Sequence, residues 1–140
     1  MEFCMSGLSI GKLAKTCEVK IDTVRYYERK GLILPIERTE SGYRVYSQES
    51  IKRLRFIRKS QSLGFTLEEI KELLELSEMP ETDCADIREK ASVKIKEVEK
   101  RISDLLDIKA SLKELSEFCP GKGKPLNECS ILKHFYGEKP

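Results

Sequence analysis

The stretch from Ala85 to Phe118 contains neither Gly nor Pro, and it constrains the fold more than any other part of the chain. Its apolar residues recur in steps of four, three and then seven, which predicts a helix with a heptad seam. The seam consists of Ala91, Ile95, Val98, Ile102, Leu105, Leu112 and Cys119. A helix of this length extends on the order of 50 Å, too far for one small domain to cover. We therefore expect it to pair with a second copy, parallel or antiparallel.

A loop bracketed by Cys119 and Cys129 follows this helix. Gly121 and Gly123 allow backbone angles that other residues resist, and two prolines limit the freedom of the unfolded loop. Bringing the two sulfurs together should therefore cost little. The loop alone leaves three interpretations open: a site for a thiophilic metal ion, two small buried hydrophobic residues, or a disulfide.

The cysteine count and the start of the chain bear on the cellular setting. Five cysteines is an odd number, and residues 1–6 lack a basic segment followed by an apolar one. No apolar run is long enough to span a membrane. We expect a cytoplasmic protein with free thiols or metal ligands rather than a disulfide framework. Cys4 and Cys17 are expected to be incidental.

Charge is distributed unevenly along the chain, although the formal net charge is only +2. Residues 1–63 carry 13 Lys and Arg against 7 Asp and Glu, whereas residues 64–140 carry 13 against 17. A basic N-terminal half suits a phosphate backbone as partner, and a solvated surface of mixed charge gives a similar count.

Two short helical patterns joined by a tight turn occupy the start of the basic half. Ser9 can cap a helix over 10–16, and a second helix over about 21–30 is stopped by Gly31. This is the helix-turn-helix pattern, whose second helix enters the major groove of DNA. The residues left facing outward on that helix include Lys20, Asp22, Thr23, Arg25, Tyr26 and Arg29.

A small hairpin is predicted next, with strands over 36–38 and 43–46. Gly42 occupies the turn position that needs a positive φ. The hairpin carries Arg38, Tyr43 and Arg44, so it is interpreted as a wing that grips the DNA backbone, the alternative being a plain connection.

Two further helices complete the first domain. Ser47 is expected to cap a helix over about 48–62, and Thr66 with Glu69 forms a capping box for a helix ending near Leu76. The predicted fold class is all-α with a small β wing: a winged helix-turn-helix domain plus a long coiled-coil dimerisation helix. An antiparallel pairing of that helix is the more consequential one, because it would place Cys84 of one chain near the Cys119 and Cys129 positions of the other. We place the DNA-binding domain at 8–76, a hinge at 77–84, the dimerisation helix at 85–118, and a metal-binding loop with a short C-terminal helix at 119–136.

Four motifs in this sequence resemble the mercury-resistance-regulator (MerR) family of bacterial transcription factors. They are Ile10-Gly11-x-Leu13-Ala14, the run from Thr23 to Ile33, Arg38-x-x-x-Gly42-Tyr43-Arg44-x-Tyr46, and Leu63-Gly64-Phe65-x-Leu67-x-Glu69-Ile70. The resemblance implies a homodimer on a palindromic promoter, which distorts the DNA when effector binds so that RNA polymerase can use it. The residues it implies in DNA contact are Lys20, Thr23, Arg25, Tyr26, Tyr27, Arg38, Tyr43 and Arg44.

The same resemblance narrows the effector. About 20 residues follow the long helix, as in the metal-sensing branch, where a short loop stands in place of a drug-binding domain. Sensors of monovalent copper, silver and gold resemble this chain but carry Ser where it has Cys84. A third thiolate suits a divalent soft ion, so Cys84, Cys119 and Cys129 are implied as a site shared across the dimer. The expected order is mercury, then cadmium or lead, then zinc.

Several alternatives remain beside this interpretation. His134 is either a fourth ligand or a surface residue, and nine residues separate Cys119 from Cys129, which bears on the coordination geometry. The same fold could serve a monovalent metal sensor or a thiol redox switch. A thiol enzyme would need a base near its cysteine, and His134 is the single histidine of the sequence. A purely structural coiled coil would leave Arg25, Tyr26 and the wing unexplained.

Overall fold

The computed structural model describes residues 7–138, so Cys4 lies outside the described residues. The chain divides into two compact units, residues 1–90 and 91–140, and the division falls inside the long helix α5 (Cys84–Glu117). Cys84 therefore belongs to the same unit as the helix-turn-helix elements, whereas Cys119 and Cys129 belong to the other.

The first unit opens with the short strand β1 (Leu8–Ser9) and the two helices α1 (Ile10–Thr16) and α2 (Ile21–Arg29). As predicted, the Ser9 side chain caps α1 by accepting a hydrogen bond from the backbone N–H of Lys12 at 3.1 Å. Gly31 ends α2 with a φ of 76°, and the next N–H donates back to the Tyr27 carbonyl at 3.0 Å. These local signals confirm the predicted helix-turn-helix.

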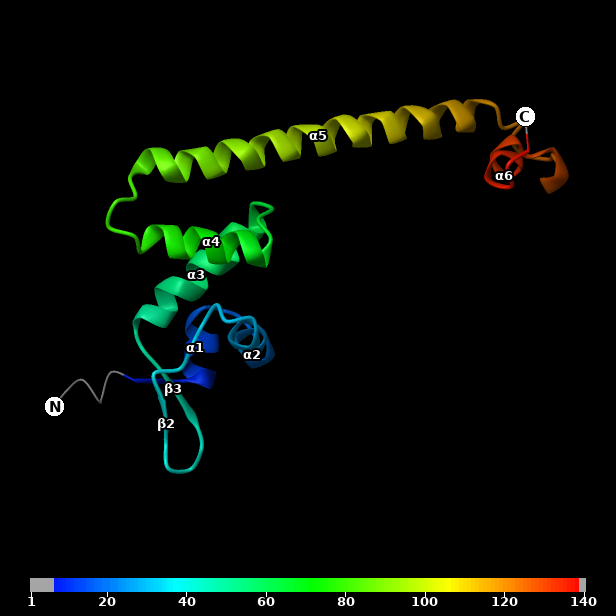
Figure 1. Ribbon diagram of the computed structural model, residues 1–140. Helices are drawn as coiled ribbons and strands as arrows, with labels where there is room; N and C mark the ends of the chain where they lie inside the picture. Colours follow the sequence, from blue (N-terminus) through cyan, green and yellow to red (C-terminus); the bar gives the residue numbers. More distant parts are fainter. Residues whose placement is uncertain (1–6, 139–140) are drawn as a thin grey trace. The chain divides into compact units, whose positions relative to one another are not determined.

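The wing is the hairpin of β2 (Glu37–Arg38) and β3 (Arg44–Tyr46), which projects from the helices (Figure 1). Its turn is closed by a hydrogen bond from the Thr39 N–H to the Tyr43 carbonyl at 2.7 Å, with Gly42 at a φ of 85° as expected. The sheet has a third strand that the sequence pattern did not indicate. β1 pairs antiparallel with β3, giving the order β1-β3-β2 and fastening the wing to the start of the domain.

The helices α3 (Glu49–Ser62) and α4 (Leu67–Ser77) follow the wing. Thr66 and Glu69 form the predicted capping box, with hydrogen bonds of 3.2 and 2.8 Å. The prediction that Ser47 caps α3 is wrong. The helix begins at Glu49, one residue later than predicted, and Gln48 occupies the cap position. Ser47 instead contributes its carbonyl, which accepts from the N–H of Ser50 at 3.0 Å.

One hydrophobic core holds these elements together. It draws its buried side chains from all four helices of the domain, from β1 and β3, and from the segment after α2. Its fully buried members include Leu13, Val24, Tyr27, Leu32, Ile33, Tyr46, Leu54, Ile57 and Ile70. The second helix of the helix-turn-helix, α2, is called the recognition helix below. The recognition helix and the wing pack on one shared core, which sets their relative positions.

The predicted long helix is present as the uninterrupted α5 of 34 residues. Asp83 starts it by accepting hydrogen bonds from the N–H groups of Ala85 and Asp86 at 2.9 and 3.2 Å. A short 3₁₀ turn (Leu126–Glu128) and the helix α6 (Ser130–Phe135) follow the cysteine loop. No helix among residues 7–138 is both long and apolar enough to cross a membrane.

Candidate nucleic-acid interface and thiol positions

The recognition helix presents a basic, hydroxyl-bearing face. Lys20 and Arg25 are exposed and Thr23 is half-buried. The Arg25 guanidinium lies 3.6 Å from the Asp22 carboxylate, with 51% and 90% of these side chains exposed. An ion pair this exposed contributes little to stability, so Arg25 can exchange it for a phosphate or a guanine edge.

Tyr26 gathers two cations at the end of the same helix. The Arg29 guanidinium carbon lies 6.0 Å from the centre of its ring and the Lys30 ammonium nitrogen 5.6 Å. Tyr26 is 41% exposed, and Arg29 and Lys30 are exposed as well. This corner of the domain combines positive charge with a hydroxyl donor, which suits phosphate oxygens.

Tyr27 is the exception among the predicted DNA contacts. Its side chain is 2% exposed, and its hydroxyl bonds to the Gln61 side-chain oxygen on α3. Two tyrosines in succession on a helix point about 100° apart, so one faces out and the next faces the core. In this structure Tyr27 is therefore a core side chain that joins α2 to α3, and its contact with DNA stays a prediction.

On the wing, Arg38 and Tyr43 are exposed, whereas Arg44 is half-buried. The Nε atom of Arg44 lies 2.7 Å from a carboxylate oxygen of Glu28, in the last turn of α2. The other Glu28 oxygen accepts a hydrogen bond of 2.7 Å from the Tyr46 hydroxyl. Burial raises the pKa of Tyr46, and the bond to Glu28 raises it further, because both disfavour the phenolate.

A second contact that the sequence pattern did not reveal is centred on Arg53 of α3. Its Nε donates to the Leu32 carbonyl at 2.5 Å, and its Nη1 lies 2.8 Å from the Glu78 carboxylate. Leu32 follows the recognition helix and Glu78 caps the end of α4. Arg53 thus links the recognition helix to the first residues of the segment we assigned as the hinge. In the sequence it was one of several cations on α3, with nothing to single it out.

The three cysteines proposed as ligands are free, with Cys84 and Cys119 exposed and Cys129 half-buried. Cys84 is the first residue of α5, and Cys119 follows its last residue by two positions. Cys129 occupies the cap position of α6. Exposed free thiols are the donor chemistry that soft metal ions prefer, so this set fits such an ion. Within residues 7–138 of one chain, no three His, Cys, Asp or Glu side chains gather into a metal-holding group.

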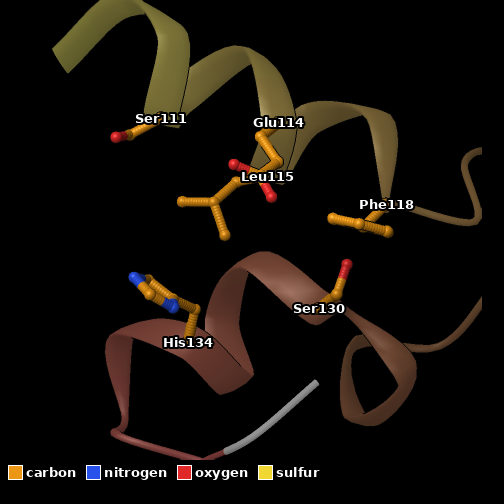
Figure 2. A pocket seen from close by; sticks show the side chains of 6 residues that line it. All are labelled: Ser111, Glu114, Leu115, Phe118, Ser130 and His134. Atoms are coloured by element: carbon orange, nitrogen blue, oxygen red, sulfur yellow. The ribbon is translucent and has the colours of Figure 1, made fainter. Parts of the chain in front are cut away.

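Within the second unit, α6 lies against the end of α5 (Figure 2). A cavity of about 210 Å³ between them is lined by Ser111, Glu114, Leu115 and Phe118 from α5 and by Ser130 and His134 from α6. The imidazole of His134 faces α5 across this cavity (Figure 2). His134, which was considered as a fourth metal ligand, thus lines the cavity between α6 and α5.

Cys17 differs from the three proposed ligand cysteines in its surroundings. It is half-buried behind α1, with its thiol directed at the Ile51 carbonyl at 3.8 Å. Burial raises the pKa of the Cys17 thiol, and the positive charge of Arg55 offsets part of that rise. A raised pKa makes a thiol a poorer nucleophile and metal ligand, which agrees with the expectation that Cys17 is incidental to the site.

Comparison with known families decides what this arrangement is. The family described as MerR HTH family regulatory protein matches residues 8–77, and the family described as MerR, DNA binding, matches residues 51–115. The two matches together run from β1 into the last turn of α5. This chain belongs to the MerR family. Members of this family are DNA-binding transcription regulators and not enzymes, and homodimers are typical of it.

Individual MerR relatives align over most of the chain. A mercuric resistance operon regulatory protein of Bacillus cereus is 46% identical over 124 residues, covering 89% of this chain and 93% of the relative. The transcriptional regulator ZntR of Escherichia coli K12 is 41% identical over 125 residues, covering 89% of each. The solved structure of PbrR691 from Ralstonia metallidurans CH34 in complex with lead(II) has a TM-score of 0.81 and 31% identity, covering 91% of this chain and 98% of that one.

Proposed function

We propose that this MerR protein is a homodimeric, metal-responsive transcription regulator of a metal-resistance or efflux gene. In this proposal the winged helix-turn-helix holds promoter DNA. A divalent thiophilic ion at Cys84, Cys119 and Cys129 then drives the distortion of the DNA that activates transcription by RNA polymerase. The proposal is supported by family membership, by the free thiols, and above all by the spacing of apolar residues and cysteines along α5.

The main support for the proposal is that one antiparallel pairing of two α5 helices brings both the apolar residues and the cysteines together. The apolar side chains along α5 are exposed in the single chain, Ile95 to 55% and Leu112 to 54%. If two copies of α5 pair antiparallel with Val98 opposite Leu105, then Ala91 falls opposite Leu112 and Ile95 opposite Ile108. The same register sets Cys84 opposite Cys119. One arrangement therefore covers the apolar seam and unites the thiols, whereas a parallel pair would hold these two cysteines about 50 Å apart.

The chemistry of the thiols favours a soft divalent ion. Thiolates select soft metals, and three of them place more negative charge on the site than two do. Cys84 also lies at the N-terminal end of a long helix, where the helix dipole favours an anionic ligand set. Within this proposal we keep the order mercury, then cadmium or lead, then zinc; relatives are named for mercury resistance and for a complex with lead(II).

The DNA contacts in this proposal come from two elements of the first unit. The recognition helix supplies Lys20, Thr23, Arg25 and Tyr26, and the wing supplies Arg38 and Tyr43. Ion binding would tie the loop of one chain to the hinge of the other and shift the DNA-binding domain on α5. The energy for distorting the DNA then comes from the difference in metal affinity between the two conformations.

The testing experiment is a competitive titration of the reduced protein with Hg(II), Cd(II), Pb(II), Zn(II) and Cu(I), followed by sulfur-to-metal charge-transfer absorption. Cys84→Ser should lose the divalent site. The matched control, Cys17→Ser, should keep it, because Cys17 is half-buried against the core of the first unit, where burial raises the pKa of its thiol. Tight Cu(I) binding that Cys84→Ser leaves unchanged would indicate a two-thiolate sensor of monovalent metals instead.

Mixed dimers test whether the site is shared between chains. Neither Cys84→Ser nor Cys119→Ser should bind a divalent ion as a homodimer. A heterodimer of the two variants, made by joint refolding, should recover one site per dimer, because the intact Cys84 then faces an intact Cys119. A site contained within one chain would give no recovery. A promoter response to oxidant in metal-free protein, with loss of two titratable thiols, would favour the redox-switch alternative.

A further inference from the structure

The Glu28 carboxylate joins the recognition helix to the wing. Its side chain is only 13% exposed, and each of its two oxygens has a partner on β3. One oxygen lies 2.7 Å from Arg44 Nε and the other accepts from the Tyr46 hydroxyl at 2.7 Å. Arg44 and Tyr46 are two residues apart on the strand, so they share one face of it. A single acidic side chain therefore holds the base of the wing.

The register of the wing gives this carboxylate a second task. Arg38 and Arg44 are directly opposite in the β2–β3 pairing. Like charges in that position repel, which weakens a hairpin only two residue pairs long. Glu28 neutralises Arg44, so Arg38 is left as the exposed cation of the pair. The two arginines are chemically equal in the sequence but differ in surroundings.

We propose that Glu28 is a positioning residue that fixes the wing on the recognition helix through Arg44 and Tyr46. Arg44 then acts through the fold, and Arg38 carries the contact of this strand pair with phosphate. This inference rests on the DNA interface proposed above, and it departs from the family resemblance, which implied Arg44 itself in DNA contact.

The variant Glu28→Gln distinguishes a positioning role from a simple charge effect, because the two predict opposite changes in DNA affinity. Removing a negative charge from a DNA-binding surface tightens binding if charge alone matters. Loosening the wing, in contrast, weakens DNA binding. We expect Glu28→Gln to lower affinity on the order of tenfold, because the Arg44 contact loses its charge while Gln keeps the size of the side chain. Glu40→Gln, at the exposed wing turn, is the matched control and should leave affinity equal or higher.

The salt dependence of binding distinguishes Arg38 from Arg44. The assay is fluorescence anisotropy of the full chain on a labelled duplex that the wild-type protein has selected from a randomised pool. Arg38→Gln should reduce the slope of log affinity against log salt by about 1, the amount expected for one lost phosphate contact. Arg44→Gln should weaken binding without changing that slope. The double variant Glu28→Gln with Arg44→Gln should bind no more weakly than Arg44→Gln alone, because the Arg44 contact is already lost and the amide oxygen at position 28 can still accept from the Tyr46 hydroxyl.

Tyr46→Phe provides a variant that keeps the buried ring and the ion pair. It removes the hydrogen bond from the Tyr46 hydroxyl to Glu28 and should lower affinity about threefold at an unchanged salt slope. The inference is overturned if Glu28→Gln binds as tightly as wild type or tighter, or if Arg44→Gln reduces the slope as Arg38→Gln does. Failure of wild-type protein to select any duplex would instead contradict the DNA interface itself.

Discussion

Replacing Arg53 by Gln should destabilise the protein far more than replacing the glutamate with which it pairs. Arg53 bonds at 2.5 Å to the carbonyl of Leu32, a residue that is 1% exposed, and the Arg53 side chain is itself 33% exposed. A hydrogen bond from a charged donor is worth about 1.5–3 kcal/mol, and partial exposure places this one near the lower limit. We therefore expect Arg53→Gln to lower the free energy of unfolding by about 1.5 kcal/mol.

Glu78→Gln removes only the ion pair at the other end of Arg53. The Glu78 side chain is 64% exposed, so the pair is screened by water and contributes about 0.5 kcal/mol. The assay is urea unfolding of the reduced full chain at one fixed protein concentration, because dimer dissociation makes the midpoint depend on concentration. Lys52→Gln, an exposed neighbour on α3, is the control and should change little.

The reasoning is refuted if Glu78→Gln costs as much as Arg53→Gln, or if Arg53→Gln behaves like the Lys52 control. Either result would mean that the Leu32 carbonyl finds another partner, or that the energy lies in the ion pair. A loss confined to Arg53→Gln would identify the carbonyl contact as the main fastening between the recognition helix and the hinge.

Three further outcomes follow from local contacts. Thr66→Ala should cost about 1 kcal/mol of stability in urea unfolding by removing the capping box of α4, whereas Thr66→Ser should restore most of it. The pKa of Tyr46 is raised above its ordinary value of 10.0, so its protonated form contributes stability that is fully present below about pH 10 and is lost as pH rises beyond it. Tyr46→Phe should therefore flatten the alkaline decline of stability above that pH. Cys17 should react with iodoacetamide more slowly than Cys119, measured by peptide mass spectrometry, because burial raises the pKa of its thiol.

Each of these expectations has a contrary result. A Thr66→Ser variant no more stable than Thr66→Ala would show that the hydroxyl is not the stabilising group. If the stability of Tyr46→Phe fell at alkaline pH as steeply as that of the wild type, other groups would be responsible for the fall. Equal alkylation rates would show that Cys17 is not protected by its surroundings.

The sequence alone determined the helices, most of their ends and the overall type of domain, although not the start of α3 or the strand β1. Caps such as Ser9 and the pair Thr66 and Glu69 act within one helical turn, and Gly31 and Gly42 are needed where the backbone adopts a positive φ. The heptad repeat of α5 is likewise a local pattern. Because these signals involve residues no more than a turn or two apart, they are legible before any folding is known, and they were sufficient for the winged helix-turn-helix and the long helix.

Only the tertiary structure decided which polar side chains are free to act. Tyr26 and Tyr27 are adjacent and chemically identical, yet one is 41% exposed and the other 2%, because only one points at α3. Glu28 and Tyr46 meet across 18 positions of sequence, and Arg53 reaches a carbonyl 21 positions away. Residue type states what a side chain can do, but its partner and its exposure depend on how distant segments pack on one core, and no local pattern contains that information.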